Sequence, residues 1–127
     1  DHAPHSPDEK ALGMEKAPFG VVGLETAFPL IYTNLVRTRM ATLQQAIAWF
    51  SLNPAKILNL DEGRIVVGRK ADLTVLDLNR RKTIDKNQFL SKGRNTPFDG
   101  WECYGWPVLT LVEGKVAFCD ESFNNCK

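Results

Sequence analysis

Hydrophobic residues recur at helical spacing in the first half of the chain. Four of them share one face: Leu24, Phe28, Ile31 and Leu35. Their spacing of i, i+4, i+7 and i+11 indicates an amphipathic helix that begins at Leu24 and packs this face against a core. Pro29 lies near the start of that helix, where a missing N–H is tolerated best.

Two further helices are expected between residues 42 and 58. Thr42 with Gln45 three residues later has the arrangement of a capping box, which predicts that a helix begins there. The inward face of this helix holds four apolar side chains: Leu43, Ala46, Ile47 and Phe50. Asn53 and Pro54 suit the N-cap and first position of a short helix that runs to Leu58.

The pattern changes to short strands after residue 60. They are expected over residues 64–67, 72–77, 108–112 and 115–119. The alternation in 72–77 predicts burial on most of both faces, and Glu113-Gly114 suits the tight turn of a hairpin. One helical turn fits residues 86–90. The chain therefore divides near residue 60 into a helical part, 1–60, and an antiparallel β part, 61–127.

The net charge and the cysteines of the chain indicate which kinds of partner and which cellular compartment to expect. The formal net charge of +1 gives no indication of a nucleic-acid or membrane-surface partner, and no apolar run is long enough to span a membrane. The basic run Arg80-Arg81-Lys82 is expected in a solvated turn or sheet edge. Three cysteines match no metal-ligand spacing, namely Cys103, Cys119 and Cys126. They indicate reduced thiols of a cytoplasmic protein, with a disulfide as the less favoured alternative.

The candidate chemistry is concentrated at the beginning of the chain. Asp1-His2-Ala3-Pro4-His5 places a carboxylate and two imidazoles in a loop that Pro4 stiffens, and such loops often carry metal or acid–base chemistry. The alternative is an inert, frayed terminus. Further on, Phe19-Gly20 lies in a long loop rich in proline and glycine, where backbone N–H and C=O groups can approach a flat ligand. The alternative there is a turn glycine beside a core phenylalanine.

Five segments of the chain resemble known motifs. Residues 1–10, beginning Asp-His-Ala-Pro-His, and residues 17–27, containing Pro-Phe-Gly, resemble the dihydroorotase family. Residues 95–100, beginning Asn-Thr-Pro-Phe, resemble the same family. Residues 51–55 and 68–73 resemble cyclic-amide amidohydrolases more widely. The similarity runs in order along nearly the whole chain and leaves out only the tail after Asp120.

This resemblance implies an α/β fold. Members of the family have a metal-dependent (β/α)8 TIM barrel and a small β-sandwich built from both chain ends, with the active site at the C-terminal ends of the barrel strands. Residues 1–60 would be the active-site loop and helices after barrel strand eight, and residues 61–127 the C-terminal part of the sandwich. The chain, which begins at Asp1, would be the C-terminal piece of a longer polypeptide.

The resemblance also implies an activity and site residues. Dihydroorotase interconverts N-carbamoyl-L-aspartate and L-dihydroorotate in pyrimidine biosynthesis with one or two Zn²⁺ ions. By this likeness Asp1 ligates zinc and carries the proton, His5 binds the substrate carboxylate, and Phe19 and Gly20 meet the ring. His2 would have a supporting or structural role. The remaining metal ligands, a His-x-His pair, a modified lysine and two histidines, would lie upstream, so the isolated chain would be inactive.

Two other functions stay open. One is another cyclic amidase, an allantoinase or hydantoinase, against which Ala3 and His5 argue because allantoinases carry a different version of this motif. The other is a non-catalytic subunit that scaffolds aspartate carbamoyltransferase, which intact Asp1 and His5 make less favoured. The expected partners are the small-molecule substrate, the upstream part of the enzyme and a second copy in a homodimer.

Overall fold

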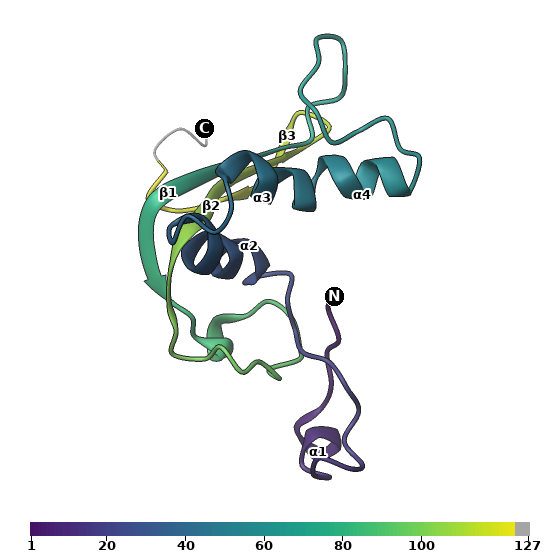
Figure 1. The fold of residues 1–127 in the computed structure, drawn as a ribbon, viewed down its shortest axis with the longest axis vertical. Coiled ribbons are helices and arrows are strands. Elements are labelled where there is room, and N and C mark those ends of the chain that lie inside the picture. Colours follow the sequence, from purple (N-terminus) through teal and green to yellow (C-terminus); the bar gives the residue numbers. More distant parts are fainter. Residues whose placement is uncertain (124–127) are drawn as a thin grey trace.

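The computed structural model describes residues 1–123 as a mixed helix–strand fold (Figure 1). Its helical elements are α1 (Pro7–Lys10), α2 (Ala27–Ile31), the π-helix η1 (Tyr32–Val36), α3 (Leu43–Phe50), α4 (Leu52–Ile57) and the 3₁₀ turn η2 (Lys86–Gln88). Its strands are β1 (Leu73–Thr83), β2 (Glu102–Val112) and β3 (Lys115–Cys119). The N-terminal segment and α1 lie at one end of the molecule, apart from α3 and α4.

The strands form one antiparallel sheet in the order β1-β2-β3. Glu113 and Gly114 join β2 to β3 with φ angles of 52° and 78°, the two positive values that a two-residue type I′ hairpin turn requires. The predicted hairpin is therefore confirmed. Between Asp77 and Arg81 the register of β1 slips, so that residues 78–80 oppose the single residue Gly105 of β2. Asp77 Oδ1 accepts the N–H groups of Asn79 and Arg80 and holds this bulge.

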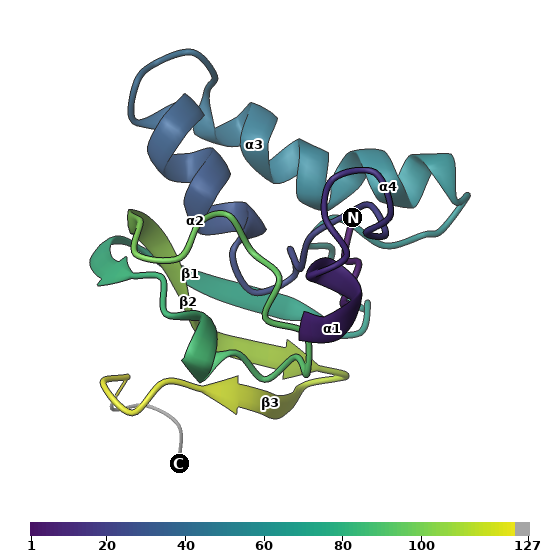
Figure 2. The same cartoon turned by 90° about the horizontal axis from the view of Figure 1, so that it is seen from below.

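The helices cover one face of this sheet. Figure 2 shows α2 between the sheet and α3, with β3 at the far edge. Thr33 of η1 joins helix to strand, because its Oγ1 accepts the Tyr104 N–H at 2.8 Å. The Arg37 guanidinium lies 3.7 Å from the centre of the Tyr104 ring. The fully enclosed apolar set is small: Val22, Ala46, Ala55, Ile84, Cys103 and Val108.

Each predicted helical segment contains a helix, but some boundaries differ and one helix was missed. Thr42 and Gln45 form the expected capping box at the start of α3. The first helix begins at Ala27 rather than Leu24, whose side chain is 78% exposed in a turn. The third helix, α4, has Ser51 at its N-cap, so Pro54 is the third helical residue rather than the first, two positions later than predicted. A helix missed by the sequence, α1, has its own capping box of Ser6 and Glu9.

Three strand predictions need correction. The strand expected at 108–112 begins six residues earlier, at Glu102, as β2. Residues 64–67 form no strand but an open loop, in which Val67 is fully exposed. The strand expected at 72–77 extends through Thr83, and it is not buried on both faces, since Val75 is 41% exposed. The basic residues Arg80, Arg81 and Lys82 lie in β1, which is an edge strand of the sheet, as one of the two expectations had it. The helical turn near residue 86 is confirmed as η2.

The cysteines differ from one another. Cys103 is a free thiol buried under η1, and burial raises its pKa against the opposing effect of a hydrogen bond with Thr33. Cys119 is disulfide-bonded, which corrects the expectation of a reduced thiol there. Cys126 lies outside the described residues. None of the helices in residues 1–123 is both long and apolar enough to cross a membrane.

Candidate functional site

The N-terminal segment lies alongside residues 19–24 in van der Waals contact. The Ala3 N–H donates to the Val21 carbonyl at 2.9 Å. A Cβ at Gly20 would lie 2.4 Å from the Ala3 Cβ, and a Cβ at Gly23 would lie 2.4 Å from the Asp1 carbonyl oxygen. Both distances are far shorter than atoms allow, so glycine is required for the two segments to touch. This contact brings the two predicted halves of the site together.

His2 fixes this contact rather than facing solvent. Its Nδ1 accepts the backbone N–H groups of Gly23 at 3.1 Å and Leu24 at 3.3 Å. The ring proton therefore resides on Nε2, which lies 3.4 Å from the Ser91 hydroxyl. These contacts match the structural role expected for His2.

His5 connects the N-terminal segment to the Phe19-Gly20 turn. Its Nε2 lies 2.9 Å from the Phe19 carbonyl oxygen and donates to it, while Nδ1 faces the Glu9 carboxylate at 3.9 Å. Hydrogen bonds from Ser6, its backbone N–H first and its hydroxyl second, hold the pKa of Glu9 below the usual value. A shallow hollow of about 280 Å³ adjoins His5 on the side of Lys92 and Gly93.

Gly20 presents its N–H group, but not its carbonyl, to a ligand. The Gly20 carbonyl accepts from Lys10 Nζ at 3.1 Å and from Asn95 Nδ2 at 3.2 Å, so it is already occupied. Within the described part of the chain, the Gly20 N–H has no acceptor. Phe19 is 92% exposed and thus not a core residue. Of the two predicted backbone contacts, only the N–H is open to a ligand.

A third segment, residues 89–95, closes the site and was not predicted to take part. Asn95 donates from Nδ2 to the Ala3 carbonyl at 2.8 Å, and its Oδ1 accepts the His5 N–H at 3.1 Å. The Glu25 carboxylate accepts the N–H groups of Leu90 and Ser91. Asparagine is common in turns, so its type alone does not mark it as a bridge. The one indication in the sequence is the family-like motif that begins at Asn95, and that motif by itself assigns the residue no role.

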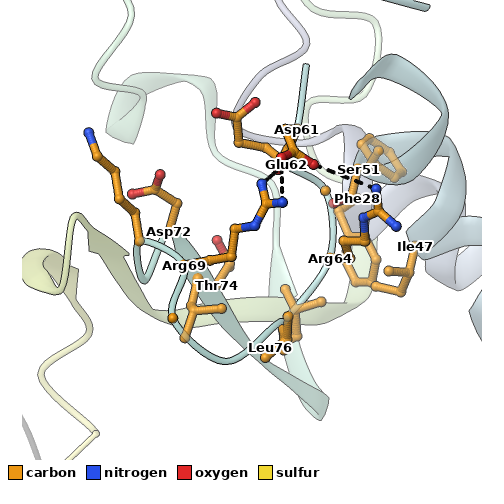
Figure 3. Close-up of a pocket in the computed structure, with 16 residues that line it drawn as sticks. Phe28, Ile47, Ser51, Asp61, Glu62, Arg64, Arg69, Asp72, Thr74 and Leu76 are labelled. Carbon is orange, nitrogen blue, oxygen red and sulfur yellow. Dashed lines mark hydrogen bonds and ion pairs between the residues drawn. The ribbon is translucent and has the colours of Figure 1, made fainter. Parts of the chain in front are cut away.

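A larger hollow than the one beside His5, about 850 Å³, lies elsewhere, between the helices and β1 (Figure 3). Phe28, Ile47 and Leu76 form an apolar part of its wall. Arg69 and Arg64 both pair with Asp61 at its rim. Neither Asp1 nor His5 lines it. Its size therefore does not make it the site of the predicted chemistry.

Comparison with known proteins identifies the family to which the chain belongs. The model of the Amidohydrolase family matches residues 7–117. The chain belongs to the amidohydrolase family. A dihydroorotase of Bacillus thuringiensis is 55% identical over 96% of the chain, and one of Bacillus cytotoxicus is 56% identical over the same share. The chain spans 28% of the length of these relatives.

Solved amidohydrolase structures share its fold. The D-hydantoinase (dihydropyrimidinase) of a Thermus species matches with a TM-score of 0.84 and 32% identity over 94% of this chain and 27% of its own. The L-hydantoinase (dihydropyrimidinase) of Arthrobacter aurescens matches with a TM-score of 0.76 and 38% identity over 82% of this chain and 24% of its own. These matches and the mixed helix–strand content confirm the expected amidohydrolase fold class.

Amidohydrolases of the dihydroorotase type are generally metal-dependent, and zinc needs several donor side chains in one place. Asp1 is exposed, and its Oδ1 accepts the His2 N–H at 2.8 Å. Across residues 1–123, no three His, Cys, Asp or Glu side chains gather as a metal site. Zinc in proteins takes three or four ligands, usually with N or S donors. The described residues of this chain therefore do not make up a zinc centre by themselves.

Proposed function

We propose that this chain is part of a dihydroorotase, which interconverts N-carbamoyl-L-aspartate and L-dihydroorotate in pyrimidine biosynthesis. The observation that carries the proposal is the 55% identity to a Bacillus dihydroorotase over 96% of the chain. The identity to the solved hydantoinases is lower, 32% and 38%. The contact between the Asp1–His5 and Phe19-Gly20 segments supports the same activity, because it joins a proton carrier to a ring-binding turn.

Asp1 is proposed as the proton carrier. Its carboxylate is exposed, and in the part of the chain that is described Oδ2 has no hydrogen-bond partner. It would take a proton as the ring amide is attacked and return it to the leaving ring nitrogen. Asp1 would also be one oxygen ligand of a Zn²⁺ centre whose other ligands lie outside this chain. Bound zinc supplies a Lewis acid for the carbonyl and lowers the pKa of water.

His5, Phe19 and Gly20 are proposed as the substrate-binding residues. His5 and the cationic Lys92 line the same hollow, where an anionic carboxylate would bind, and the His5 ring would exchange its contact with the Phe19 carbonyl for one with this carboxylate. The free N–H of Gly20 would donate to a ring carbonyl oxygen, and the exposed Phe19 ring would cover one face of the flat ring.

The rest of the enzyme is proposed to complete the fold. Residues 1–60 would follow the last barrel strand, and residues 61–127 would be the C-terminal part of a β-sandwich. The upstream part of the enzyme would fill the hollow at Phe28 and Ile47. A homodimer, a cytoplasmic location and association with aspartate carbamoyltransferase belong to the same proposal. In the alternative scaffold function, the protein would bind aspartate carbamoyltransferase without catalysing any reaction itself.

The roles are tested by steady-state kinetics on the full-length enzyme. Asp1→Asn should lower kcat by about 10²–10⁴-fold with little change in KM, because proton transfer in the transition state is lost. His5→Ala should raise KM by about 10- to 100-fold, the equivalent of one charged hydrogen bond of roughly 1.5–3 kcal/mol. Asp8→Asn, an exposed carboxylate on α1, is the matched control and should leave both constants unchanged.

Near-normal turnover of Asp1→Asn would contradict the proton-carrier role. The hydantoinase alternative is favoured by the TM-score of 0.84 and is decided by substrate preference. A larger kcat/KM for hydantoin than for dihydroorotate would replace the proposed substrate. No turnover of either would leave the scaffold role.

A further inference from the structure

The side chain of Asn95 contacts both the N-terminal segment and the Phe19-Gly20 turn. Within the N-terminal segment it makes no hydrogen bond to Asp1 or His2. Asn95 donates from Nδ2 to the carbonyl oxygens of Ala3 at 2.8 Å and Gly20 at 3.2 Å. Its Oδ1 accepts the His5 N–H at 3.1 Å, and its own carbonyl accepts the Val22 N–H at 3.1 Å. A single amide thus holds the residues on both sides of Pro4 against the Phe19-Gly20 turn.

The chemistry of these contacts permits only one amide orientation. Two carbonyl oxygens face Nδ2, which has two hydrogens to donate, and one N–H faces Oδ1. The flipped amide would place an oxygen against two oxygens and an NH₂ group against an N–H. The side chain therefore sets the distance between His5 and Gly20, and it can do so in one geometry only.

The segment that carries Asn95 is itself held rigidly. The Arg94 guanidinium donates to the carbonyl of Phe89 at 2.6 Å and to that of Ser91 at 3.2 Å. Glu25 accepts the N–H groups of Leu90 and Ser91, which fastens the same segment to the start of α2. Gly93 is buried against Pro4, and a Cβ there would lie 2.7 Å from the Pro4 Cβ. Asn95 therefore stands on a fixed support, as a positioning group needs.

We propose that Asn95 is a positioning residue for substrate binding, one that sets the spacing between His5 and the Gly20 N–H. This inference rests on the proposed function, since His5 and Gly20 are its substrate contacts. Asn95 does not contact Asp1, so it affects substrate affinity and selectivity more than proton transfer. Loss of one charged hydrogen bond to the substrate weakens binding by about 10- to 100-fold, which is the scale expected when this spacing is lost.

The test uses the full-length enzyme with Asn95→Asp, Asn95→Ala and the control Asn87→Asp. Asn95→Asp keeps the acceptor for His5 but turns a carboxylate oxygen toward the Ala3 and Gly20 carbonyls. Asn87 is exposed on η2, and its side chain makes no hydrogen bond to the described residues, so its variant introduces the same charge without the bridge. We expect KM for dihydroorotate to rise about 10- to 100-fold in both Asn95 variants, with kcat changed less than threefold and the control unchanged.

Two further measurements separate positioning from general stability. The Asn95→Ala effect on KM should be smaller in a His5→Ala background, because part of it acts through His5. Backbone hydrogen exchange at the His5 amide should be at least tenfold faster in Asn95→Ala than in the control. Unchanged KM in both Asn95 variants, or the same fold-change in both backgrounds, would overturn the inference.

Failure of the proposed function would look different. In that case the unmodified enzyme would turn over neither dihydroorotate nor N-carbamoyl-aspartate. The exchange measurement would still decide the role of Asn95. Equal exchange of the His5 amide in Asn95→Ala and the control would overturn the role of Asn95 in fixing the spacing of His5 and Gly20, and faster exchange would support that spacing role for whatever ligand replaces dihydroorotate.

Discussion

Gly105 offers a direct test of how the helices are joined to the sheet. It lies in β2 opposite the bulge of β1, with φ of 81°, and it is buried. A Cβ at this position would lie 2.6 Å from Cδ1 and 2.9 Å from Cγ of Tyr32. That ring stacks on Phe28 with centroids 6.0 Å apart and an interplanar angle of 10°, so it has little room to move away. Gly105→Ala should therefore push η1 off the sheet.

The expected cost has two parts. An L-residue in the left-handed region costs about 1–2 kcal/mol, and overpacking a closed contact costs a further 1–3 kcal/mol or so. Gly105→Ala should thus destabilise the helix–sheet contact by roughly 2–5 kcal/mol. Gly100 is a matched control because its φ is also 81° and a Cβ there would have no neighbour within 4 Å. Gly100→Ala should show only the cost of placing an L-residue at positive φ. Replacing glycine by alanine also makes the unfolded chain less flexible, and this effect is the same in both variants, so it cancels in the comparison.

Native-state hydrogen exchange of the full-length protein is the assay. The reporter is the Tyr104 amide, which donates to the Thr33 hydroxyl across the contact. We expect it to exchange about 30- to 4000-fold faster in Gly105→Ala, the equivalent of roughly 2–5 kcal/mol of local opening. If both glycine variants changed this rate equally, the close contact with Tyr32 would have no energetic role and the reasoning would be refuted.

The remaining predictions concern the tail and the isolated chain. Burial alone would raise the pKa of Asp120, but hydrogen bonds from Ser122, Lys82 and Arg80 outweigh it and hold the pKa far below the usual range. A carboxyl whose pKa is lowered by folding stabilises the fold above its unfolded pKa of about 3.9, and this contribution is lost as the pH falls below that value. Asp120→Asn should therefore cost about 1–3 kcal/mol at pH 7 and progressively less below pH ~4, as measured by the thermal midpoint against pH; a difference that did not change with pH would contradict this. The purified 127-residue chain should self-associate and bind no stoichiometric zinc, because Ile47, Trp49 and Phe50 are each 40–44% exposed. Light scattering and metal analysis test this, and a zinc-loaded monomer would show the reasoning to be wrong.

Features that depend on neighbouring residues were predictable from the sequence. The Thr42–Gln45 capping box and the Glu113-Gly114 turn are satisfied within a few residues, so their local chemistry determines them. Leu24 was assigned to a helix because its spacing fits, yet its N–H is taken by His2 from 22 residues away. Residues 64–67 have a strand-like pattern, but a strand also needs a partner, and the described residues give it none.

The candidate site also contains residues that the sequence could single out and one that it could not. Asp1, His5, Phe19 and Gly20 could be singled out because their types and motifs carry chemistry. Asn95 could not, since its amide acts across 92 residues on the carbonyl of Ala3. Neither composition nor periodicity reports a contact of that length.

The three-segment contact also has a consequence for the order of folding. The hydrogen bonds that join the N-terminal segment to residues 91–95 close loops of 89 to 92 residues. Closing a loop of that length costs more chain entropy than forming the β2–β3 hairpin or the α3 helix, and local structure forms faster. We therefore expect the hairpin, the helices and the β1–β2 pairing to form first. The site would be assembled last, so that the His5 amide becomes protected only in chains that have otherwise completed their fold.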